Sequence, residues 1–214
     1  MARTRRNTRE IVVIGGGGHA KVLVSVLRKS GYQVRGYTDQ QDRGEILGVR
    51  YLGPDNNLSE VARSCARAII GVGKTDASAL RLELQERLGA LGFEFPVICS
   101  PDAVVNEEVS LGAGTAVFDG VVITSGARIG RACIVNTNGT VEHDCRIGDN
   151  VHLAPGVVLS GGVTIGDNSM LGAGTTAIHG VGICAGCLIG AGATLVEDIT
   201  APGTYAGSPA RRIK

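Results

Sequence analysis

An aliphatic residue recurs at every sixth position through the second half of the chain, and this period limits what the sequence can fold into. The series starts at Val105 and ends at Leu195, and Ala177 is its only small member. A period of six fits neither the 3.6-residue repeat of an amphipathic helix nor the two-residue alternation of a half-buried strand. The pattern therefore predicts a parallel β-helix built from hexapeptides, a solenoid made of short internal repeats.

A second column lies four places after each aliphatic residue and holds only small or β-branched side chains. It begins with Val109, Thr115, Val121, Ala127 and Cys133. In a solenoid the large column fills the interior and the small column fits the corners. Because three hexapeptides close one coil, residues 18 apart stack at about one strand spacing, roughly 4.8 Å. In this region, the number of residues between two positions therefore predicts how far apart they lie in space.

The composition agrees with a narrow aliphatic interior. The chain has 33 glycines, 3% aromatic residues and no tryptophan, whereas large rings supply much of the buried area in ordinary globular cores. The net charge is +1, and no extended run of like charge suggests a nucleic-acid partner. No segment approaches the roughly 18 apolar residues of a transmembrane helix. We expect a cytoplasmic protein with no membrane partner.

The six cysteines favour buried thiols over a metal site. Cys133, Cys145 and Cys187 fall in the small column, where a cysteine packs as a small apolar residue. Cys184 and Cys187 form a C-x-x-C pair, but no second pair with metal-ligand spacing accompanies it. We therefore predict no bound metal.

The first hundred residues predict a small α/β domain, and residues 101–214 the solenoid domain with its tail. Apolar runs and helical periodicity alternate along residues 10–99, which favours a parallel sheet with helices on both faces. We expect strands at 10–14, 33–38, 68–72 and 95–99, and helices from the glycine-rich turn to 29, at 57–66 and at 75–91.

A glycine-rich turn joins the first expected strand to the first helix. Gly15-x-Gly17-x-x-Ala20 is the G/A form of the dinucleotide-binding fingerprint, in which backbone N–H groups at a helix N-terminus face a phosphate. Asp39 ends the second strand, about where an acidic residue meets a ribose hydroxyl. About 100 residues supply one mononucleotide-binding half, so a nucleotide-sugar fits better than NAD. His19 is expected to face solvent at the start of the helix.

One column of the predicted solenoid combines histidine with glycine. Ser125, His143, Gly161 and His179 stand 18 residues apart and are expected to stack on successive coils. His143 supplies a base, and Gly161 supplies a backbone N–H with no side chain in front of it. Acyl transfer needs one group to take a proton and one donor for the oxyanion. We predict that His143 is catalytic.

Polar residues accompany His143 along the chain. Asp144 follows it and polarises the imidazole if the turn joins the two side chains. Asn136 lies one face earlier, although asparagine and aspartate also suit tight turns. His179 has no acidic neighbour and is the weaker candidate. His152 occupies another phase of the repeat, where the spacing fits a surface residue and a ligand equally well.

Four segments together resemble one family of enzymes. They are residues 14–20 (IGGGGHA), residues 135–145 (VNTNGTVEHDC), the hexapeptide run, and residues 206–213 (AGSPARRI). The combination is similar to the sugar acyltransferases of the PglD/NeuD type, which include bacterial N-acetyltransferases of nucleotide-linked 4-aminosugars. The resemblance covers nearly the whole chain.

The resemblance implies a Rossmann-like domain that binds the nucleotide-linked aminosugar, followed by a left-handed parallel β-helix that forms a homotrimer. Acetyl-CoA is implied as the cosubstrate, lying between neighbouring β-helices. His143 is implied to be the general base, with Asp144 as its hydrogen-bond partner. The implied substrate contacts are Gly17, His19, Asp39, Gly73, Lys74 and Asn136, and the implied acetyl-CoA contacts are His152, Gly161, Gly190 and Ala191.

The resulting hypothesis is direct acyl transfer. The C4 amine of a nucleotide-linked 4-amino-4,6-dideoxysugar attacks the acetyl-CoA thioester, His143 accepts the amine proton, and the Gly161 N–H stabilises the oxyanion. Three alternatives stay open: an O-acetyltransferase of the sialic-acid type, an NAD-dependent oxidoreductase and a noncatalytic scaffold. The sequence does not distinguish UDP, GDP and dTDP as the nucleotide.

Overall fold

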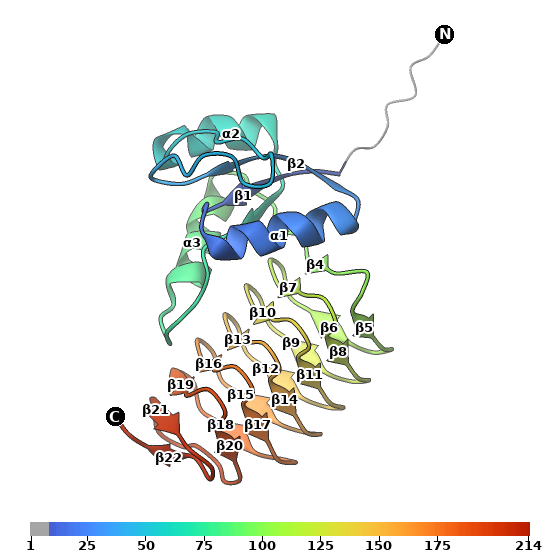
Figure 1. Ribbon diagram of the computed structural model, residues 1–214, viewed down its shortest axis with the longest axis vertical. Coiled ribbons are helices and arrows are strands. Elements are labelled where there is room, and N and C mark those ends of the chain that lie inside the picture. Colours follow the sequence, from blue (N-terminus) through green and yellow to red (C-terminus); the bar gives the residue numbers. More distant parts are fainter. Residues whose placement is uncertain (1–8) are drawn as a thin grey trace. The chain divides into compact units, whose positions relative to one another are not determined.

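The computed structural model describes residues 9–214, which divide into two compact units (Figure 1). The first unit holds the described residues up to Gly73 together with Leu88–Phe95. The second unit holds Lys74–Arg87 and Pro96–Lys214. The division falls inside a helix, so residues 74–87 belong structurally with the second unit.

The first unit is a small α/β fold around a three-stranded parallel sheet. Its strands are β1 (Arg9–Ile14), β2 (Tyr32–Thr38) and β3 (Ala68–Ile70), in the order β2-β1-β3. Its helices are α1 (Gly18–Lys29) and α2 (Leu58–Ser64), with a 3-10 turn, η1 (Asp55–Asn57), before α2. Figure 1 shows α1 and α2 on opposite faces of the sheet. The predicted Rossmann-like alternation is confirmed.

Hydrophobic burial explains where β1 and α1 form. Residues 11–14 of β1 are at most 3% exposed, as expected for a central strand covered on both faces. α1 buries Ala20, Leu23 and Leu27, which is the spacing of an amphipathic helix with one apolar side. Gly31, with a φ of 78°, follows the helix in the left-handed conformation that commonly ends helices.

The second unit is a left-handed parallel β-helix whose short strands form three sheets (Figure 1). The first sheet contains β4 (Ile98–Cys99), β7 (Ala116–Val117), β10 (Ile134–Val135), β13 (His152–Leu153), β16 (Met170–Leu171), β19 (Cys187–Ile189), β21 (Gly203–Ala206) and β22 (Arg211–Arg212). The second sheet contains β5 (Val104–Val105), β8 (Val122–Ile123), β11 (Thr140–Val141), β14 (Val158–Leu159), β17 (Thr176–Ala177) and β20 (Thr194–Leu195). The third sheet contains β6 (Ser110–Leu111), β9 (Arg128–Ile129), β12 (Arg146–Ile147), β15 (Thr164–Ile165) and β18 (Gly182–Ile183).

The aliphatic column of the sequence forms the core of this β-helix. Ile123 and Leu159 are fully buried, and so are Val121 and Val157 of the small column. Val141 pairs with Leu159 in parallel register, 18 residues further along the chain. The predicted period, strand direction and coil length are therefore confirmed.

Each hexapeptide also contains one residue with a positive φ, three residues after the aliphatic position. This left-handed position recurs at every sixth residue from Glu108 to Gly192, with φ between 55° and 76°. Glycine, asparagine and aspartate tolerate the conformation best. Glycine fills most of these places, and Asn138, Asp144 and Asn150 are among the others.

Two expectations about the junction between the units are wrong. The helix expected at 75–91 is shorter, because α3 spans only Leu80–Ala90 and the preceding residues form an irregular segment. The strand expected at 95–99 is reduced to β4, and it pairs with β7 of the β-helix rather than with the N-terminal sheet. Cys99 lies six residues before Val105. The inward column of the solenoid therefore begins one hexapeptide earlier than its first aliphatic residue indicates.

Shortening a core residue should destabilise the β-helix. Ile165 on β15 is 1% exposed, so Ile165→Ala is expected to cost about 2–5 kcal/mol in the free energy of unfolding, from lost burial plus a cavity. Urea denaturation measures the change. Thr164→Ala, on the exposed side of the same strand, is the matched control and should stay within about 0.5 kcal/mol of wild type. Equal effects of the two changes would contradict the assigned core.

Candidate active site

His143 and Asp144 form a hydrogen-bonded pair at the corner that follows β11. The distance between His143 Nδ1 and Asp144 Oδ2 is 2.9 Å. Asp144 occupies the left-handed position, with a φ of 60°. The two side chains are 59% and 74% exposed, so a substrate can reach the imidazole, whose other nitrogen is Nε2. The expected pairing is present, and its catalytic use stays a prediction.

Gly161 lies against the His143 ring, one coil further along. A Cβ atom on Gly161 would lie 2.6 Å from His143 Cε1 and closer still to Nε2, so a larger residue leaves no room for the ring. The next residue, Gly162, donates its N–H to the His143 carbonyl at 2.8 Å. The Gly161 N–H makes no such bond within residues 9–214. The predicted stacking of His143 on Gly161 is confirmed, and it leaves a backbone donor beside the ring.

Asn136 belongs to a different cluster, at the corner that follows β10. Its Nδ2 lies 3.2 Å from His152 Nε2, and its Oδ1 accepts a hydrogen bond from the Thr137 N–H at 2.8 Å. In the part of the chain that the structure describes, Asn136 makes no hydrogen bond with His143. The sequence grouped Asn136 with His143, but one strand separates their corners within a single chain.

Gly190 and Ala191 stand at the same corner as Asn136, three coils further along. Small residues line this corner between them, because Ala154 and Gly172 occupy the intervening coils. A Cβ atom on Gly172 would come within 2.9 Å of Ala191 Cα, so the coils approach closely here. Ala191 is exposed. The corner offers a smooth backbone surface, and its contact with acetyl-CoA stays a prediction.

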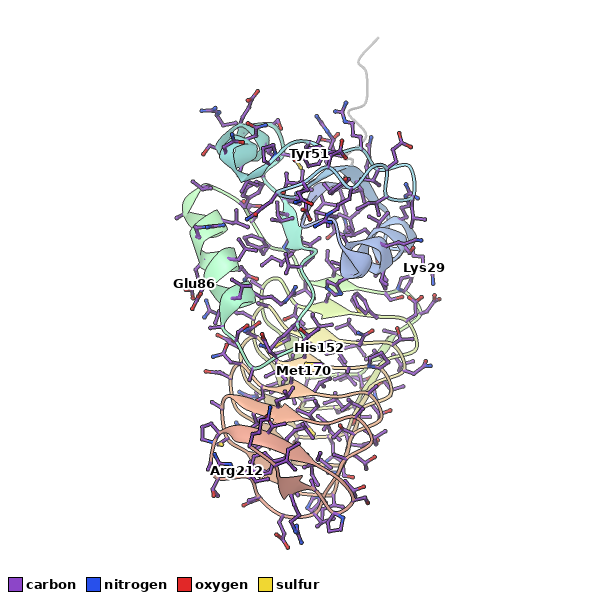
Figure 2. The ribbon with its side chains drawn as sticks, turned by 60° about the vertical axis from the view of Figure 1, so that its left-hand side comes forward. Lys29, Tyr51, Glu86, His152, Met170 and Arg212 are labelled. Atoms are coloured by element: carbon purple, nitrogen blue, oxygen red, sulfur yellow. The ribbon has the colours of Figure 1, made fainter. Side chains whose placement is uncertain are left out.

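His152 is a buried residue, only 8% exposed, although it points outward from β13. Its Nδ1 lies 2.7 Å from the Lys74 carbonyl oxygen, and its Nε2 faces Asn136. Figure 2 shows His152 with Met170 on the next coil of the first sheet. Burial lowers the pKa of His152 to about 4, and the charges of Arg81 and Lys74 act in the same direction. The ring is therefore neutral at pH 7.

Protonation of His152 should destabilise the fold. Its pKa of about 4 in the folded protein lies below the unfolded value of 6.5, so the unfolded chain binds more protons between these pH values. The free energy of unfolding should therefore fall as the pH drops through this window, by about 3 kcal/mol in total from this residue. Urea denaturation at pH 7, 6 and 5 measures the slope. The slope should be smaller in His152→Gln, and an unchanged slope would contradict the assignment.

The glycine-rich turn of the first unit has one packed side and one open side. Gly15, with a φ of 107°, and Gly16 leave no room for a Cβ, because Val72 and the Tyr37 ring lie within 3 Å of that position. Gly17 and Gly18 have no neighbour within 4 Å of theirs. The open glycines begin α1, whose first turn carries no acidic residue. Such a helix start favours an anion.

Asp39 holds the glycine-rich turn in shape. Its Oδ2 accepts a hydrogen bond from the Gly16 N–H at 2.8 Å, and its Oδ1 accepts one from the Gln41 N–H at 3.1 Å. Burial alone would raise the pKa of Asp39, but these bonds and the Arg43 guanidinium outweigh it and lower the pKa below its usual value. Asp39 is therefore ionised and already hydrogen-bonded. Its expected contact with a ribose stays a prediction.

The other expected nucleotide-sugar contacts lie where β1 and β3 end. His19 is half-buried, and a Cβ on Gly73 would meet the His19 Cβ at 3.6 Å, so His19 faces Gly73 rather than solvent alone. Lys74 is only 5% exposed, and its Nζ donates to the Ser78 carbonyl at 2.5 Å. Burial lowers the pKa of Lys74. The Lys74 side chain thus hydrogen-bonds within its own loop, and its contact with a substrate stays a prediction.

Sequence reasoning missed two residues beside the glycine-rich turn. Tyr37 is fully buried against Gly16, and its hydroxyl donates to the Gly44 carbonyl at 2.7 Å. Arg43 places Nε 3.5 Å from Asp39 Oδ1 while half of its side chain stays exposed. The distance of four residues between Asp39 and Arg43 was the only sequence signal for the second of these contacts.

Three further features of the described residues limit the kinds of site and setting that the structure supports. No group of three or more histidine, cysteine, aspartate or glutamate side chains within residues 9–214 is arranged to hold a metal ion. Cys184 and Cys187 carry free thiols with their sulfurs 3.5 Å apart. No helix in the same range combines the length and the apolarity that crossing a bilayer requires.

Family models match both parts of the chain. Residues 10–88 match the PglD N-terminal domain, and residues 144–177 match the bacterial transferase hexapeptide (six repeats). The glycine-rich turn with Asp39 therefore lies inside the first match, and Gly161 lies inside the second, which begins one residue after His143.

Solved structures resemble the chain over nearly its whole length. A histidine-to-asparagine variant of perosamine N-acetyltransferase from Caulobacter crescentus, in complex with CoA and GDP-perosamine, is 37% identical with a TM-score of 0.92. The match covers 96% of this chain and 97% of that one. The acetyltransferase domain of PglB from Neisseria gonorrhoeae, in complex with acetyl coenzyme A, is 33% identical with a TM-score of 0.90, covering 96% and 100% of the two chains.

Curated relatives match shorter stretches. UDP-N-acetylbacillosamine N-acetyltransferase of Bacillus subtilis is 33% identical over 114 residues, which is 51% of each chain. The chain thus spans about half or less of the length of the curated relatives it matches, down to 18% for a bifunctional GlmU protein. The full-length structural matches and the PglD domain match agree with each other. The chain therefore belongs to the hexapeptide-repeat sugar acyltransferases of the PglD type.

Proposed function

We propose that this protein transfers the acetyl group of acetyl-CoA to the C4 amine of a nucleotide-linked 4-amino-4,6-dideoxysugar. The observation that carries the proposal is the stacking of the His143 ring on Gly161, with Asp144 bonded to Nδ1. This arrangement leaves Nε2 as the base on a side chain that is 59% exposed, and it leaves the Gly161 N–H without a hydrogen bond in the part of the chain that the structure describes. A base beside a backbone donor is what acyl transfer to an amine requires.

The reaction proceeds by direct attack. The amine nitrogen forms a bond to the thioester carbon, His143 Nε2 accepts the amine proton, and the Gly161 N–H donates to the oxyanion. Collapse of the tetrahedral intermediate breaks the C–S bond and releases CoA, whose sulfur takes up a proton. Asp144 keeps the ring oriented and stabilises the imidazolium that forms. No residue of the protein becomes acylated.

The first unit binds the nucleotide part of the substrate in this proposal. The open N-terminus of α1, at Gly17, receives a phosphate, and Asp39 fixes the turn that presents it. His19 and Gly73 border the same end of the sheet and contribute to the binding site, and Lys74, the next residue in the chain, is proposed as a further contact. Relatives whose solved structures contain GDP-perosamine support a nucleotide-linked aminosugar as the substrate class.

A homotrimer completes the proposed site, with acetyl-CoA held between neighbouring β-helices. The outward residues of the second sheet are all uncharged, whereas those of the third sheet include Arg128 and Arg146. The outward residues of the second sheet are Val104, Val122, Thr140, Val158, Thr176 and Thr194. This face lies between the corner of Asn136 and the corner of His143. Packing it against a neighbour brings the Asn136 corner of one copy toward the His143 corner of another, which a single chain does not do.

A charge placed on this face should dissociate the trimer. Val158 is 38% exposed on β14, and Val158→Lys would bury an unpaired ammonium group in the interface. Light scattering should report three times the mass of one chain for wild type and a lower mass for the variant. Thr164→Lys, on the third sheet, is the control and should keep the wild-type mass. A wild-type monomer would refute the proposed assembly.

Release of free thiol from acetyl-CoA tests the reaction. Wild-type protein is mixed with acetyl-CoA and each of a panel of nucleotide-linked 4-aminosugars carrying UDP, GDP or dTDP, together with hydroxyl analogues. We expect thiol release with at least one aminosugar and one nucleotide. Release with hydroxyl acceptors alone would identify an O-acetyltransferase instead, and the absence of release with every acceptor would reject the proposal.

A further inference from the structure

Both ring nitrogens of His152 are already occupied inside the protein. Nδ1 lies 2.7 Å from the Lys74 carbonyl oxygen, and Nε2 lies 3.2 Å from Asn136 Nδ2. A carbonyl oxygen only accepts, so Nδ1 must carry the proton, and Nε2 then presents a lone pair. An amide nitrogen only donates, so Asn136 satisfies that lone pair. The two contacts thus define one tautomer and one direction of donation.

The Lys74 carbonyl is held in place by its own surroundings. The Lys74 ammonium donates to the Ser78 carbonyl at 2.5 Å, and Asn150 Nδ2 donates to the same carbonyl at 2.9 Å. Asn150 Nδ2 also lies 2.9 Å from Asn168 Oδ1 on the next coil. Residues 74–78 are therefore fastened to two coils of the β-helix, which gives His152 a fixed acceptor.

Asn136 is likewise held at both ends of its amide group. Oδ1 accepts from the Thr137 N–H at 2.8 Å, so the oxygen and nitrogen of the amide cannot be exchanged without losing this bond. Nδ2 donates one hydrogen to His152 and keeps a second. The amide is thus locked in one orientation, with one N–H left to bind a substrate.

We propose that His152 is a positioning residue that orients Asn136 for the aminosugar. This inference rests on the proposed function, because Asn136 is the substrate contact there. A hydrogen bond between a His152 ring nitrogen and a ligand would have to replace one of the two present contacts, to Lys74 or to Asn136, in a residue that is 8% exposed. The chain of contacts runs from Lys74 through His152 to Asn136.

Two substitutions of His152 test the roles of its two ring nitrogens separately. The side-chain amide of asparagine reaches the place of Nδ1, and that of glutamine reaches the place of Nε2. His152→Gln retains an acceptor for Asn136, whereas His152→Asn retains only the donor to Lys74. We expect His152→Asn to raise KM for the aminosugar about tenfold, the equivalent of one lost hydrogen bond. His152→Gln should stay within about twofold of wild type, and KM for acetyl-CoA should change little in both variants.

The double variant His152→Asn with Asn136→Ala provides a thermodynamic check. If His152 acts through Asn136, the double variant should be no worse than Asn136→Ala alone. Additive losses, or a raised KM for acetyl-CoA with an unchanged KM for the aminosugar, would overturn the proposal. A purely structural role predicts equal losses in His152→Asn and His152→Gln, which would also overturn it.

Nitrogen NMR of the histidine rings tests the geometry without any turnover. We expect His152, assigned by comparison with His152→Gln, to carry its proton on Nδ1 at pH 7 in wild type and to show a shifted Nε2 resonance in Asn136→Ala. A proton on Nε2, or an unshifted resonance, would refute the hydrogen bond to Asn136. Because this readout needs no substrate, it distinguishes failure of the inference from failure of the proposed reaction, which thiol release reports.

Discussion

Replacing His143 by alanine is expected to slow acetyl transfer by about 10² to 10⁴ while acetyl-CoA still binds. The alanine removes the Nε2 that accepts the amine proton in the proposed reaction, but it leaves the coil and the Gly161 N–H in place. The loss should therefore appear in turnover rather than in the affinity for acetyl-CoA. Thiol release measures the first, and calorimetric titration with acetyl-CoA measures the second.

His179→Ala is the matched control for this experiment. His179 is an exposed histidine in the same column, two coils beyond His143, and glycine rather than aspartate follows it. We expect His179→Ala to keep turnover within about twofold of wild type, because a surface histidine without a substrate contact contributes little to catalysis. Near-normal turnover of His143→Ala, or an equal loss in His179→Ala, would remove His143 from the role of general base.

Adding a single methyl group at Gly161 should have an effect of similar size. In Gly161→Ala the new Cβ would come within about 3 Å of three atoms of the His143 ring, so the ring must move away from Gly161. The base and the oxyanion donor would then be separated, and turnover should fall by about 100-fold or more. The variant thus disables the site without touching any ionisable group.

Gly182→Ala is the control for the added methyl group. Gly182 lies on β18, and the nearest atoms to its Cβ position are those of Asp198 at 3.6 to 3.9 Å, which is ordinary van der Waals contact. Both variants should unfold at nearly the same temperature as wild type, and only Gly161→Ala should lose turnover. Full activity in Gly161→Ala would mean that the His143 ring does not act from above Gly161.

The β-helix was predictable from the sequence because every coil has the same length and stacks only on its neighbours in the chain. A fixed coil length of three hexapeptides turns an offset of 18 into contact, so the position of His143 on Gly161 follows from counting. The same counting does not say what packs on the outside of a coil. His152 points outward, and the segment that contains Lys74 helps to make it a buried, neutral histidine. The residues of that segment have no period, so their path over the coil has no signature in the sequence.

The first unit was predictable only in outline for a related reason. The alternation of strands and helices gave β1, α1 and β2 at nearly their observed bounds, because each has a strong apolar pattern. Residues 95–99 also carry a short apolar run, and local pattern does not specify which sheet such a strand joins. The register of Cys99 with Val117, again 18 residues apart, assigns it to the solenoid. Long-range register decided what local propensity left undetermined.

The left-handed position of Asp144 recurs at other corners of the β-helix, so a pair like His143–Asp144 is not restricted to one coil. Glycine, asparagine and aspartate exchange there at little conformational cost, so an aspartate can occupy such a position where its Cβ meets no neighbour. Gly180, which follows His179, occupies such a position with a φ of 74° and no atom within 4 Å of its Cβ position. An aspartate at Gly180 would therefore recreate a histidine–aspartate pair two coils away. Equivalent left-handed positions recur along the β-helix, so a single substitution can create a histidine–aspartate pair on another coil.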